Sequence, residues 1–256
     1  MIKITFLGTG TSQGIPVIGS DHPVSFSDDL KDKRLRSSIL IEYKDFNFVI
    51  DCGPDFRQQM LKTNCRKLDA IIFTHEHADH TTGIDDVRPY FFRQGKIPIY
   101  LHERVLNSLH NRFAYIFDPK QKYPGAPDFE VNLITKENDF QILGLNIIPI
   151  EAVHYKLPVL GFRLGKFAYL TDVKTISDKE MLKLNGLDTL VINALRYESH
   201  PSHLNIEEAL EIVNQVKPKQ TFFTHISHNM GFHEEVCSNL PKSVSLAFDG
   251  LVLEVD

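Results

Sequence analysis

Three histidines and one aspartate stand within a single short segment and form the strongest group of potential metal ligands in the chain. The segment follows the apolar run 69–73, whose pattern predicts a buried strand. Imidazole nitrogen and carboxylate oxygen suit divalent metals of intermediate softness, such as zinc, manganese or iron. A turn after a strand can direct alternate residues at two adjacent ions. We therefore predict a metal site whose core is His75, His77, Asp79 and His80.

Histidine and aspartate residues also follow other predicted strands. Such strands are expected at Phe46–Ile50, Phe167–Leu170 and Gln220–Phe223, and in a segment that ends near Val153. Taken singly, a histidine at such a position is more often a surface or packed residue than a ligand. The residues that follow these four strands are Asp51, Asp172, His225 and His154.

The rest of the chain predicts short strands with helices between them. Further strands are expected at Ile2–Leu7, Ile39–Tyr43, Phe140–Leu143, Leu145–Ile150, Leu160–Leu164 and Thr189–Asn193, with a closing hairpin of Val244–Phe248 and Leu251–Val255. Helices are expected at Pro54–Thr63, Ile84–Phe92, Glu103–Phe117, Ser177–Leu184 and Ile206–Val216. Strands and helices of the first half of the chain recur in the second half, and no linker divides the two. We therefore expect one domain over residues 1–256, with two β-rich layers covered by helices. The proline-containing loop 118–128 fits either a flap or a connector.

Bulk composition narrows the class of protein. A chain of 256 residues with 42% hydrophobic residues can bury a substantial core. The formal net charge of −5 gives no broad positive field, which disfavours nucleic acid as a partner. Three well-separated cysteines argue against a disulfide framework and favour a reducing cytoplasm. The chain begins with a strand rather than a signal peptide, and no apolar run approaches the roughly 18 residues that span a bilayer, so we expect a soluble protein with no membrane partner.

The His-x-His-x-Asp-His pattern after a strand resembles the signature of the metallo-β-lactamase superfamily. This resemblance covers the whole chain and implies an α/β (α+β) fold, a four-layer αββα sandwich that binds two divalent metal ions. It gives Asp51 the role of orienting the histidine loop. It assigns His75, His77 and His154 to one ion and Asp79, His80 and His225 to the other, with Asp172 bridging them.

The same resemblance favours phosphoester cleavage over antibiotic hydrolysis. True β-lactamases of this superfamily commonly carry a cysteine in the second metal set, whereas the corresponding strand end here offers Asp172 and Val173. A bridging carboxylate suits two divalent ions that hold a hydroxide between them, and such a pair can neutralise a phosphoryl oxygen during in-line attack. The implied reaction is hydrolysis of a small phosphodiester or cyclic phosphate, such as a ribosyl 1,2-cyclic phosphate, by the metal-bridging hydroxide.

Three further stretches resemble the PhnP branch of phosphodiesterases, to which tRNase Z is more distantly related. They are the glycine-rich run 8–14, the stretch 34–38 and the segment 199–205. In the last of these, His203 matches the histidine that this branch uses near the scissile phosphate. An imidazole with an unperturbed pKa of about 6.5 can protonate a leaving alkoxide. His203 is therefore the predicted general acid, and His200 is the weaker candidate.

One segment departs from the PhnP pattern. Members of this branch often carry cysteines after the glycine loop that hold a structural zinc together with a histidine beyond the last active-site histidine. Here Ser20, His22 and Ser25 occupy those places, and His228 matches the histidine. Because serine is a weak zinc ligand, we predict no structural zinc, and whether His22 and His228 retain any metal stays open.

The leading hypothesis is a metal-dependent phosphodiesterase for a small-molecule substrate, with Asp79 and His203 as catalytic residues. The first alternative is tRNase Z-like RNA processing, which needs a long basic arm that this sequence does not show. The second is glyoxalase-II-like hydrolysis of a thioester, and the third is a catalytically silent metal-binding member. Zinc, manganese and iron all suit the ligands, so the metal and the physiological substrate stay open. The oligomeric state is open too, and a homodimer would be symmetric.

Overall fold

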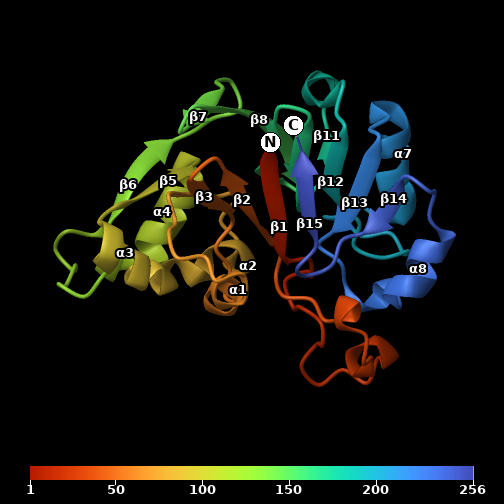
Figure 1. The fold of residues 1–256 in the computed structure, drawn as a ribbon, viewed down its shortest axis with the longest axis horizontal. Helices are drawn as coiled ribbons and strands as arrows, with labels where there is room; N and C mark the ends of the chain where they lie inside the picture. The colour runs from red at the N-terminus through yellow and green to blue at the C-terminus, as the bar shows by residue number, and fades with distance from the viewer. Residues whose placement is uncertain (256) are drawn as a thin grey trace.

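The computed structural model describes residues 1–255, in which two β-sheets pack face to face (Figure 1). The first sheet contains, in spatial order, β15 (Val252–Val255), β1 (Ile2–Gly8), β2 (Ser38–Tyr43), β3 (Phe46–Ile50), β4 (Ala70–Ile72), β5 (Ile97–Leu101) and β6 (Phe129–Leu133). The second contains β11 (Thr175–Ile176), β8 (Leu145–His154), β9 (Leu157–Leu164), β10 (Phe167–Leu170), β12 (Thr189–Asn193), β13 (Gln220–Thr224) and β14 (Val244–Leu246), and β7 (Phe140–Ile142) pairs with β8.

The helices are short and stand mainly on the outer faces of the sheets. They are α1 (Phe56–Thr63), α2 (Ala78–Thr81), α3 (Arg88–Gln94), α4 (Glu103–Arg112), α5 (Ala114–Phe117), α6 (Asp178–Met181), α7 (Ile206–Val216) and α8 (His233–Asn239). Single helical turns form η1 (Pro23–Phe26), η2 (Leu30–Asp32), η3 (Thr82–Val87), η4 (Leu182–Leu184) and η5 (His228–Met230). In Figure 1, α3 and α4 lie on the left of the molecule and α7 and α8 on the right.

Alternation along the strands explains why helices cover both outer faces. In β3, Phe48 and Ile50 join the cluster that contains residues of both sheets, whereas Val49 joins the cluster under α1 and α4. In β10, Tyr169 faces the other sheet and Leu170 faces α7. A strand that is apolar on both faces must be buried on both, so each sheet needs a helical layer outside it. The predicted four-layer αββα fold is confirmed.

Helix α7 shows how the local sequence sets an element's ends. The side chain of Asn205 accepts from the Glu208 backbone N–H, and the Glu208 side chain accepts from the Asn205 backbone N–H, which forms a capping box. The helix ends at Lys217, which adopts left-handed backbone (φ 54°) before a proline that cannot continue the helix. The buried face of α7 carries Ile206, Ala209, Val213 and Val216 at helical spacing.

The predicted closing hairpin is wrong. β14 pairs with β13 in parallel in the second sheet, whereas β15 pairs with β1 antiparallel in the first. The connection crosses between the sheets and is held by Ala247 N to Phe223 O (2.8 Å) and Gly250 N to Phe6 O (2.8 Å). Two adjacent apolar runs with a glycine between them read as a hairpin from local pattern, and only the distant partners separate them.

Other element boundaries differ from the predictions for local reasons. The expected helix 103–117 breaks at Phe113, whose backbone (φ −125°, ψ 47°) separates α4 from α5. The expected helix 84–92 is a turn, η3, followed by α3, which has Pro89 in its first turn. β8 continues through His154 because Glu151 to His154 pair with β9. The short strand β5 was not predicted.

The proline-containing loop 118–128 packs against helices rather than over the histidines. The ring of Tyr123 stacks on Tyr115, with centroids 5.9 Å apart, and Lys122 pairs with Asp128 at 2.7 Å. These contacts favour a connector over a flap. Among residues 1–255, no helix is both long and apolar enough to cross a bilayer.

Candidate metal centre

The histidine loop begins where β4 ends and is packed tightly against the turn after β3. A Cβ atom added at Gly53 would lie 2.0 Å from the carbonyl oxygen of Asp79, so only glycine allows this approach. The backbone N–H of Cys52 donates to the carbonyl of His80 (2.8 Å). The loop then turns into α2, which places Asp79 and His80 one after the other. The close packing fixes the directions of the candidate ligands.

Asp51 is the fully buried carboxylate beneath this loop. Its Oδ2 accepts from Nδ1 of His80 (2.7 Å), and its Oδ1 accepts from the backbone N–H of Thr74 (2.9 Å). The Thr74 hydroxyl also contacts both Asp51 and Nδ1 of His75 (3.0 Å). A histidine whose Nδ1–H is held in this way directs Nε2 elsewhere, here into the centre. Asp51 thus contacts His80 directly, and its orienting role stays a prediction.

The second sheet contributes residues from separate strand ends. His154 ends β8, and its Nδ1 donates to the carbonyl of Ser202 (2.7 Å). Asp172 follows β10 and His225 follows β13, and both adopt left-handed backbone (φ 59° and 55°), as does Asp51 (φ 67°). Such conformations are uncommon outside glycine and cost about 1–3 kcal/mol each, and they concentrate at functional sites.

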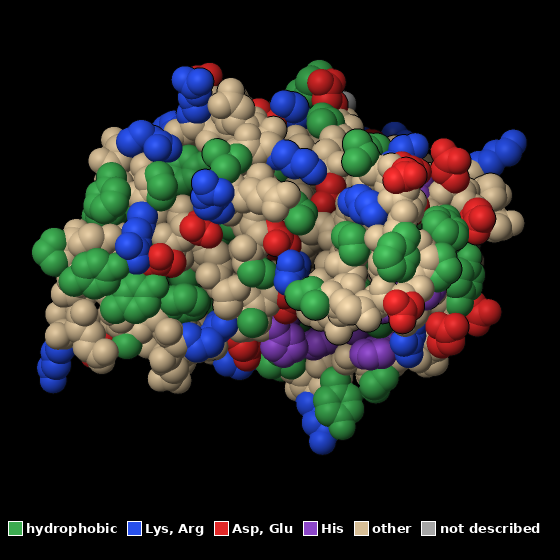
Figure 2. Space-filling view, turned by 90° about the horizontal axis from the view of Figure 1, so that it is seen from below, with side chains coloured by type: hydrophobic (Ala, Val, Ile, Leu, Met, Phe, Trp, Pro, Cys, Tyr) green, Lys and Arg blue, Asp and Glu red, His purple; other side chains and the backbone are tan. Residues whose placement is uncertain are grey.

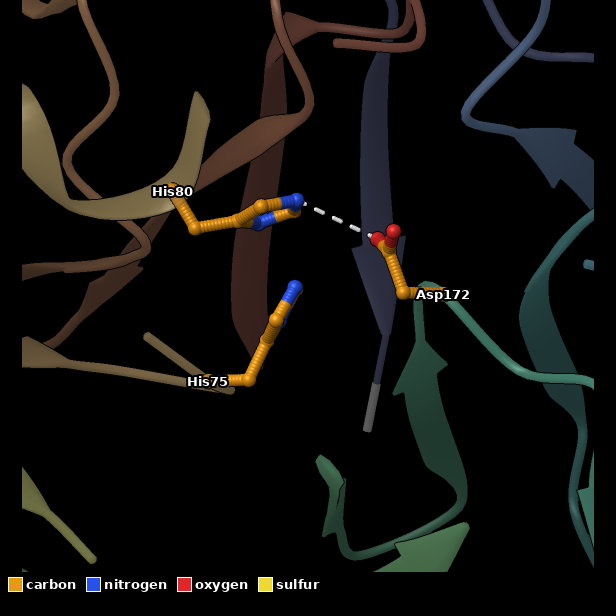
Figure 3. Close-up of side chains that lie close together, drawn as sticks. All are labelled: His75, His80 and Asp172. Carbon is orange, nitrogen blue, oxygen red and sulfur yellow. Dashed lines mark ion pairs between the residues drawn. The ribbon is translucent and has the colours of Figure 1, made fainter. Parts of the chain in front are cut away.

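These residues converge on one point between the sheets. Figure 3 shows His75 and His80 projecting from one side toward Asp172, which extends from the other. Oδ2 of Asp172 lies 3.2 Å from Nε2 of His80 and 3.2 Å from Nδ1 of His225. Ligand atoms lie within 4.8 Å of one another in three groups, which are His75 with His80 and Asp172, Asp79 with His80 and His225, and His154 with Asp172 and His203.

The remaining predicted residues lie at the edge of these groups. His77 is exposed and belongs to none of the three groups, but its ring centroid lies 4.6 Å from that of His75 and 5.1 Å from that of His154. His203 is buried, 4.5 Å from the ring of His154, with its Nδ1 3.8 Å from Oδ1 of Asp172. The ring centroid of His200 lies 5.1 Å from that of His203. Figure 2 shows histidines gathered in one part of the surface, with hydrophobic and basic side chains beside them.

The cluster shifts its own pKa values in opposite directions. Burial lowers the pKa of His75 well below its usual value, and the charge of His80 adds to this. Burial acts the same way on His80, but Asp79, Asp172 and Asp51 outweigh it and raise the pKa of His80 well above the usual value. Burial alone would raise the pKa of Asp172, yet His225 and His80 bring it well below its usual range. The negative charge gathered here is what a divalent cation would neutralise in place of the His80 proton.

Two arginines fix the outer side of the histidine loop. Nε of Arg104 donates to Oε1 of Glu76 (2.8 Å), and Nη2 of the same side chain donates to the carbonyl of Pro158 in β9. Nη2 of Arg112 donates to the carbonyl of Glu76 (2.9 Å) and to the Thr81 hydroxyl (2.8 Å). Arg104 therefore ties the loop of the first sheet to the hairpin that carries His154. No local sequence pattern predicts this contact, because its partners stand far apart in the chain.

The glycine-rich run 8–14 lies along the seam between the sheets. The hydroxyl of Thr11 lies 3.1 Å from Nε2 of His225, and the backbone N–H of Thr11 donates to the carbonyl of Ile226 (3.0 Å). The nearby Arg34 is buried and donates to the hydroxyl of Thr9 (2.8 Å). Arg36 pairs with Asp55 at 3.0 Å. Arg34 also donates to the carbonyl of Ala247 and so bridges the seam, whereas the guanidinium of Arg36 donates to Asp55 and to the Ser12 carbonyl on the side of the first sheet.

His22 and His228 stand together, as their matching positions imply, with ring centroids 5.2 Å apart. The backbone N–H of His22 donates to the Ser20 hydroxyl (3.1 Å). Among residues 1–255, the groups of three or more metal-ligating side chains all belong to the centre between the sheets. The prediction that this pair holds no structural zinc stays a prediction.

Known proteins match this chain in both sequence and structure. The family model described as "Beta-lactamase superfamily domain" matches residues 46–226. A crystal structure described as "a New Diphosphatase from the PhnP Family" superposes with a TM-score of 0.93 at 39% identity, over 100% of this chain and 98% of that one.

Two curated relatives are longer than this chain. A Porphyromonas gingivalis protein named "Octanoyltransferase" is 37% identical over 257 residues, which cover 100% of this chain and 52% of the relative. A "Ribonuclease Z" of Methanococcus maripaludis is 25% identical over 208 residues, which cover 72% of this chain and 59% of the relative. The chain thus spans only about half the length of each of these two relatives.

Proposed function

Because the chain belongs to the metallo-β-lactamase superfamily, and within it to the PhnP family, we propose that it is a two-metal hydrolase of small phosphodiesters or of diphosphates substituted at both ends. In both substrate classes the attacked phosphorus carries two bridging oxygens. The observation that carries the proposal is the position of Asp172, whose Oδ2 lies 3.2 Å from histidines of two different segments. The diphosphatase described for the relative at 39% identity supports the wider substrate class.

The residues present fit two divalent ions. Nε2 of His75 is buried and, within residues 1–255, has no hydrogen-bond partner, so it is available as a ligand atom. Nε2 of His80 is buried between the carboxylates of Asp79 (3.1 Å) and Asp172 (3.2 Å), where a cation would share these oxygens with it. We propose His75, His77 and His154 for one ion and Asp79, His80 and His225 for the other, with Asp172 shared. When bound, such ions would activate water and neutralise charge on a phosphoryl oxygen. Neutral imidazoles and ionised carboxylates are the ligand forms that this chemistry requires.

Residues of the chain supply the orientation. Asp51 holds His80, the Ser202 carbonyl holds His154, and the Thr11 hydroxyl contacts His225. Each of these partners uses one ring nitrogen and leaves the other for a ligand bond. Asp79, which the sequence analysis also names as catalytic, is proposed as a ligand that keeps its negative charge, because His80 holds the pKa of Asp79 below the usual range against the effect of burial.

His203 is proposed as the donor to the leaving oxygen. Its ring lies against His154 and His225, and Nδ1 has no hydrogen-bond partner within the described part of the chain. Burial, with the charge of His225, lowers the pKa of His203 to about 3, so the ring is neutral near pH 7 in the free protein. An anionic substrate beside the ring would raise that pKa again, since a negative charge favours the protonated form.

RNA processing is the second candidate, favoured by the match to a Ribonuclease Z. The chain has a net charge of −5, and Lys and Arg side chains are interspersed with Asp and Glu on the face shown in Figure 2. A polyanion needs a continuous basic surface, so this favours a small substrate over RNA.

Acyl transfer does not follow from the Octanoyltransferase relative, because this chain matches only half of that protein. A thiol that accepts an acyl group must be accessible as thiolate. Cys52, beside Asp51, is fully buried, and burial raises the pKa of its thiol well above the usual value. Cys52 is thus unsuited to accept an acyl group. Metal-dependent hydrolysis of a thioester, the other alternative, needs no such thiol and is tested directly in the assay below.

The test is an assay of the zinc- or manganese-loaded chain with bis(p-nitrophenyl) phosphate and with an alkyl thioester. We expect phosphodiester turnover that a chelator abolishes. Cleavage of the thioester without cleavage of the phosphodiester would contradict the proposal.

A second experiment tests His203. The variant His203→Ala should slow esters with poor leaving groups far more than activated p-nitrophenyl esters. Equal slowing of both would remove its role as donor.

A further inference from the structure

A groove opens beside the proposed metal ligands. Its volume is about 630 Å³, and its walls include Tyr155, Lys156, Leu157 and Pro201. Two further wall residues, His77 and His154, are proposed ligands of one ion. The groove is therefore within reach of a substituent on a phosphoryl group held at that ion.

Tyr155 stands at the turn between β8 and β9 for no evident structural reason. His154 pairs with Leu157, so Tyr155 is the first central residue of a two-residue turn, and its backbone is left-handed (φ 58°). Turns of this kind favour Gly, Asn or Asp at such a position, because a bulky side chain is strained there. The ring is also 63% exposed and adds little to the core. Neither the turn nor the core requires an aromatic residue at this position.

The turn is held in place at the centre's edge. Nδ1 of His154 donates to the Ser202 carbonyl (2.7 Å), and the backbone N–H of Leu160 donates to the Thr74 carbonyl (3.0 Å). The ammonium of Lys156 lies 5.3 Å from the Tyr155 ring centroid. The groove thus combines an exposed aromatic ring, apolar walls and one positive charge, which suits a ring attached to an anion.

We propose that this groove is a subsite for a planar aromatic substituent of the substrate, which stacks on Tyr155. The inference rests on the proposed phosphoryl chemistry and adds a substrate class to it. The ring of Tyr155 acts on substrate affinity and not on the reacting atoms.

The experiment compares two phosphonates that carry the same head group. Binding of phenylphosphonate and of methylphosphonate to the zinc-loaded full chain is measured by calorimetry. We expect the wild-type protein to bind phenylphosphonate about 3- to 10-fold more tightly, the range that stacking of one ring supplies. Tyr155→Asn, whose side chain tolerates left-handed backbone, should abolish this preference and leave methylphosphonate binding unchanged. Tyr155→Phe should retain the preference, since it keeps the ring.

A matched control is Phe92→Ala, because Phe92 is also 63% exposed but lies on α3, outside the residues that line the groove. This variant should keep the wild-type preference. Equal affinities of the two phosphonates in the wild-type protein, or a preference that survives Tyr155→Asn, would overturn the subsite and leave the phosphoryl chemistry standing. Failure of both phosphonates to bind the zinc-loaded chain would contradict the proposed function itself.

Discussion

The two halves of the centre are built in different ways. His75, His77, Asp79 and His80 come from one loop of the first sheet, and the buried carboxylate of Asp51 lies beneath this loop in contact with Thr74 and His80. The second sheet contributes His154, Asp172, His203 and His225 from four separate segments. Each of the latter depends on its own local contact, such as the Thr171 hydroxyl that donates to Oδ2 of Asp172 (2.7 Å).

This difference predicts how single substitutions change metal binding in each half. A contiguous loop should lose several of its proposed ligands together when the carboxylate beneath it is changed. Ligands on separate strand ends should be lost one at a time, since the strands themselves are fixed by the sheet and by the cores on either side. Metal affinity after single substitutions measures the difference directly.

The largest effect is expected for Asp51→Asn. The amide keeps the shape but loses the charge that orients His80 and the second oxygen that binds Thr74. Zinc affinity, measured by competition with a chelating indicator, should fall about 100-fold, the upper end for partners that orient ligands. Asp55→Asn is the matched control in the same half, because Asp55 pairs with Arg36 and not with a ligand. An unchanged affinity for Asp51→Asn would refute the idea that the carboxylate beneath the loop supports its ligands.

A smaller effect is expected in the other half for Thr11→Val. The substitution keeps the side-chain volume but removes the hydroxyl that lies 3.1 Å from Nε2 of His225. Zinc affinity should fall about 10-fold, the lower end for such partners, and one ion should be weakened while the other is kept. A loss of both ions together would contradict the independence of the second half.

Arg104→Lys tests the tie between the halves. Lysine keeps the charge but cannot contact both Glu76 and the Pro158 carbonyl with one planar group. Because Arg104 contacts no ligand, zinc affinity should fall by less than about 10-fold. Arg163→Lys is the control, since Arg163 binds the carbonyls of Lys183 and Asn185 away from the centre. Equal changes in affinity for both variants would show that Arg104 has no special role.

The free energy of unfolding should depend on pH through Asp249, which lies in the seam between the two sheets. Burial raises the pKa of Asp249 from 3.8 to about 6, although Thr9 and Leu35 donate to its two oxygens. The folded state therefore binds this proton more tightly than the unfolded chain does, so stability falls as pH rises from about 4 to about 6, by at most about 3 kcal/mol. Denaturant unfolding of Asp249→Asn should show a flatter dependence over this range than the wild type. An identical slope would contradict the assignment, and Asp45→Asn, in the exposed turn between β2 and β3, should keep the wild-type slope.

The sequence predicted the contiguous half more completely than the dispersed half. The spacing of His75, His77, Asp79 and His80 identifies a site by itself. His154, Asp172 and His225 were found only through the order of strand ends that the family resemblance supplied. The link of Arg104 to β9 depends on partners distant in the chain, which no local pattern contains.

Local sequence patterns predict the strands of the fold but not which strands pair. Strands such as Phe46–Ile50, Phe167–Leu170 and Thr189–Asn193 were predicted to the residue, because they are apolar on both faces and bounded by turn residues. β14 and β15 were predicted as strands but given the wrong partners, since pairing is decided by the packed sheets.

The central claim is a centre of two ions that share Asp172. The most direct test is the metal content per chain, measured by plasma mass spectrometry after zinc loading and dialysis, in the wild type and in Asp172→Asn. We predict two ions per chain in the wild type and at most one in the variant. A single ion in the wild type, or two ions retained by Asp172→Asn, would contradict the account.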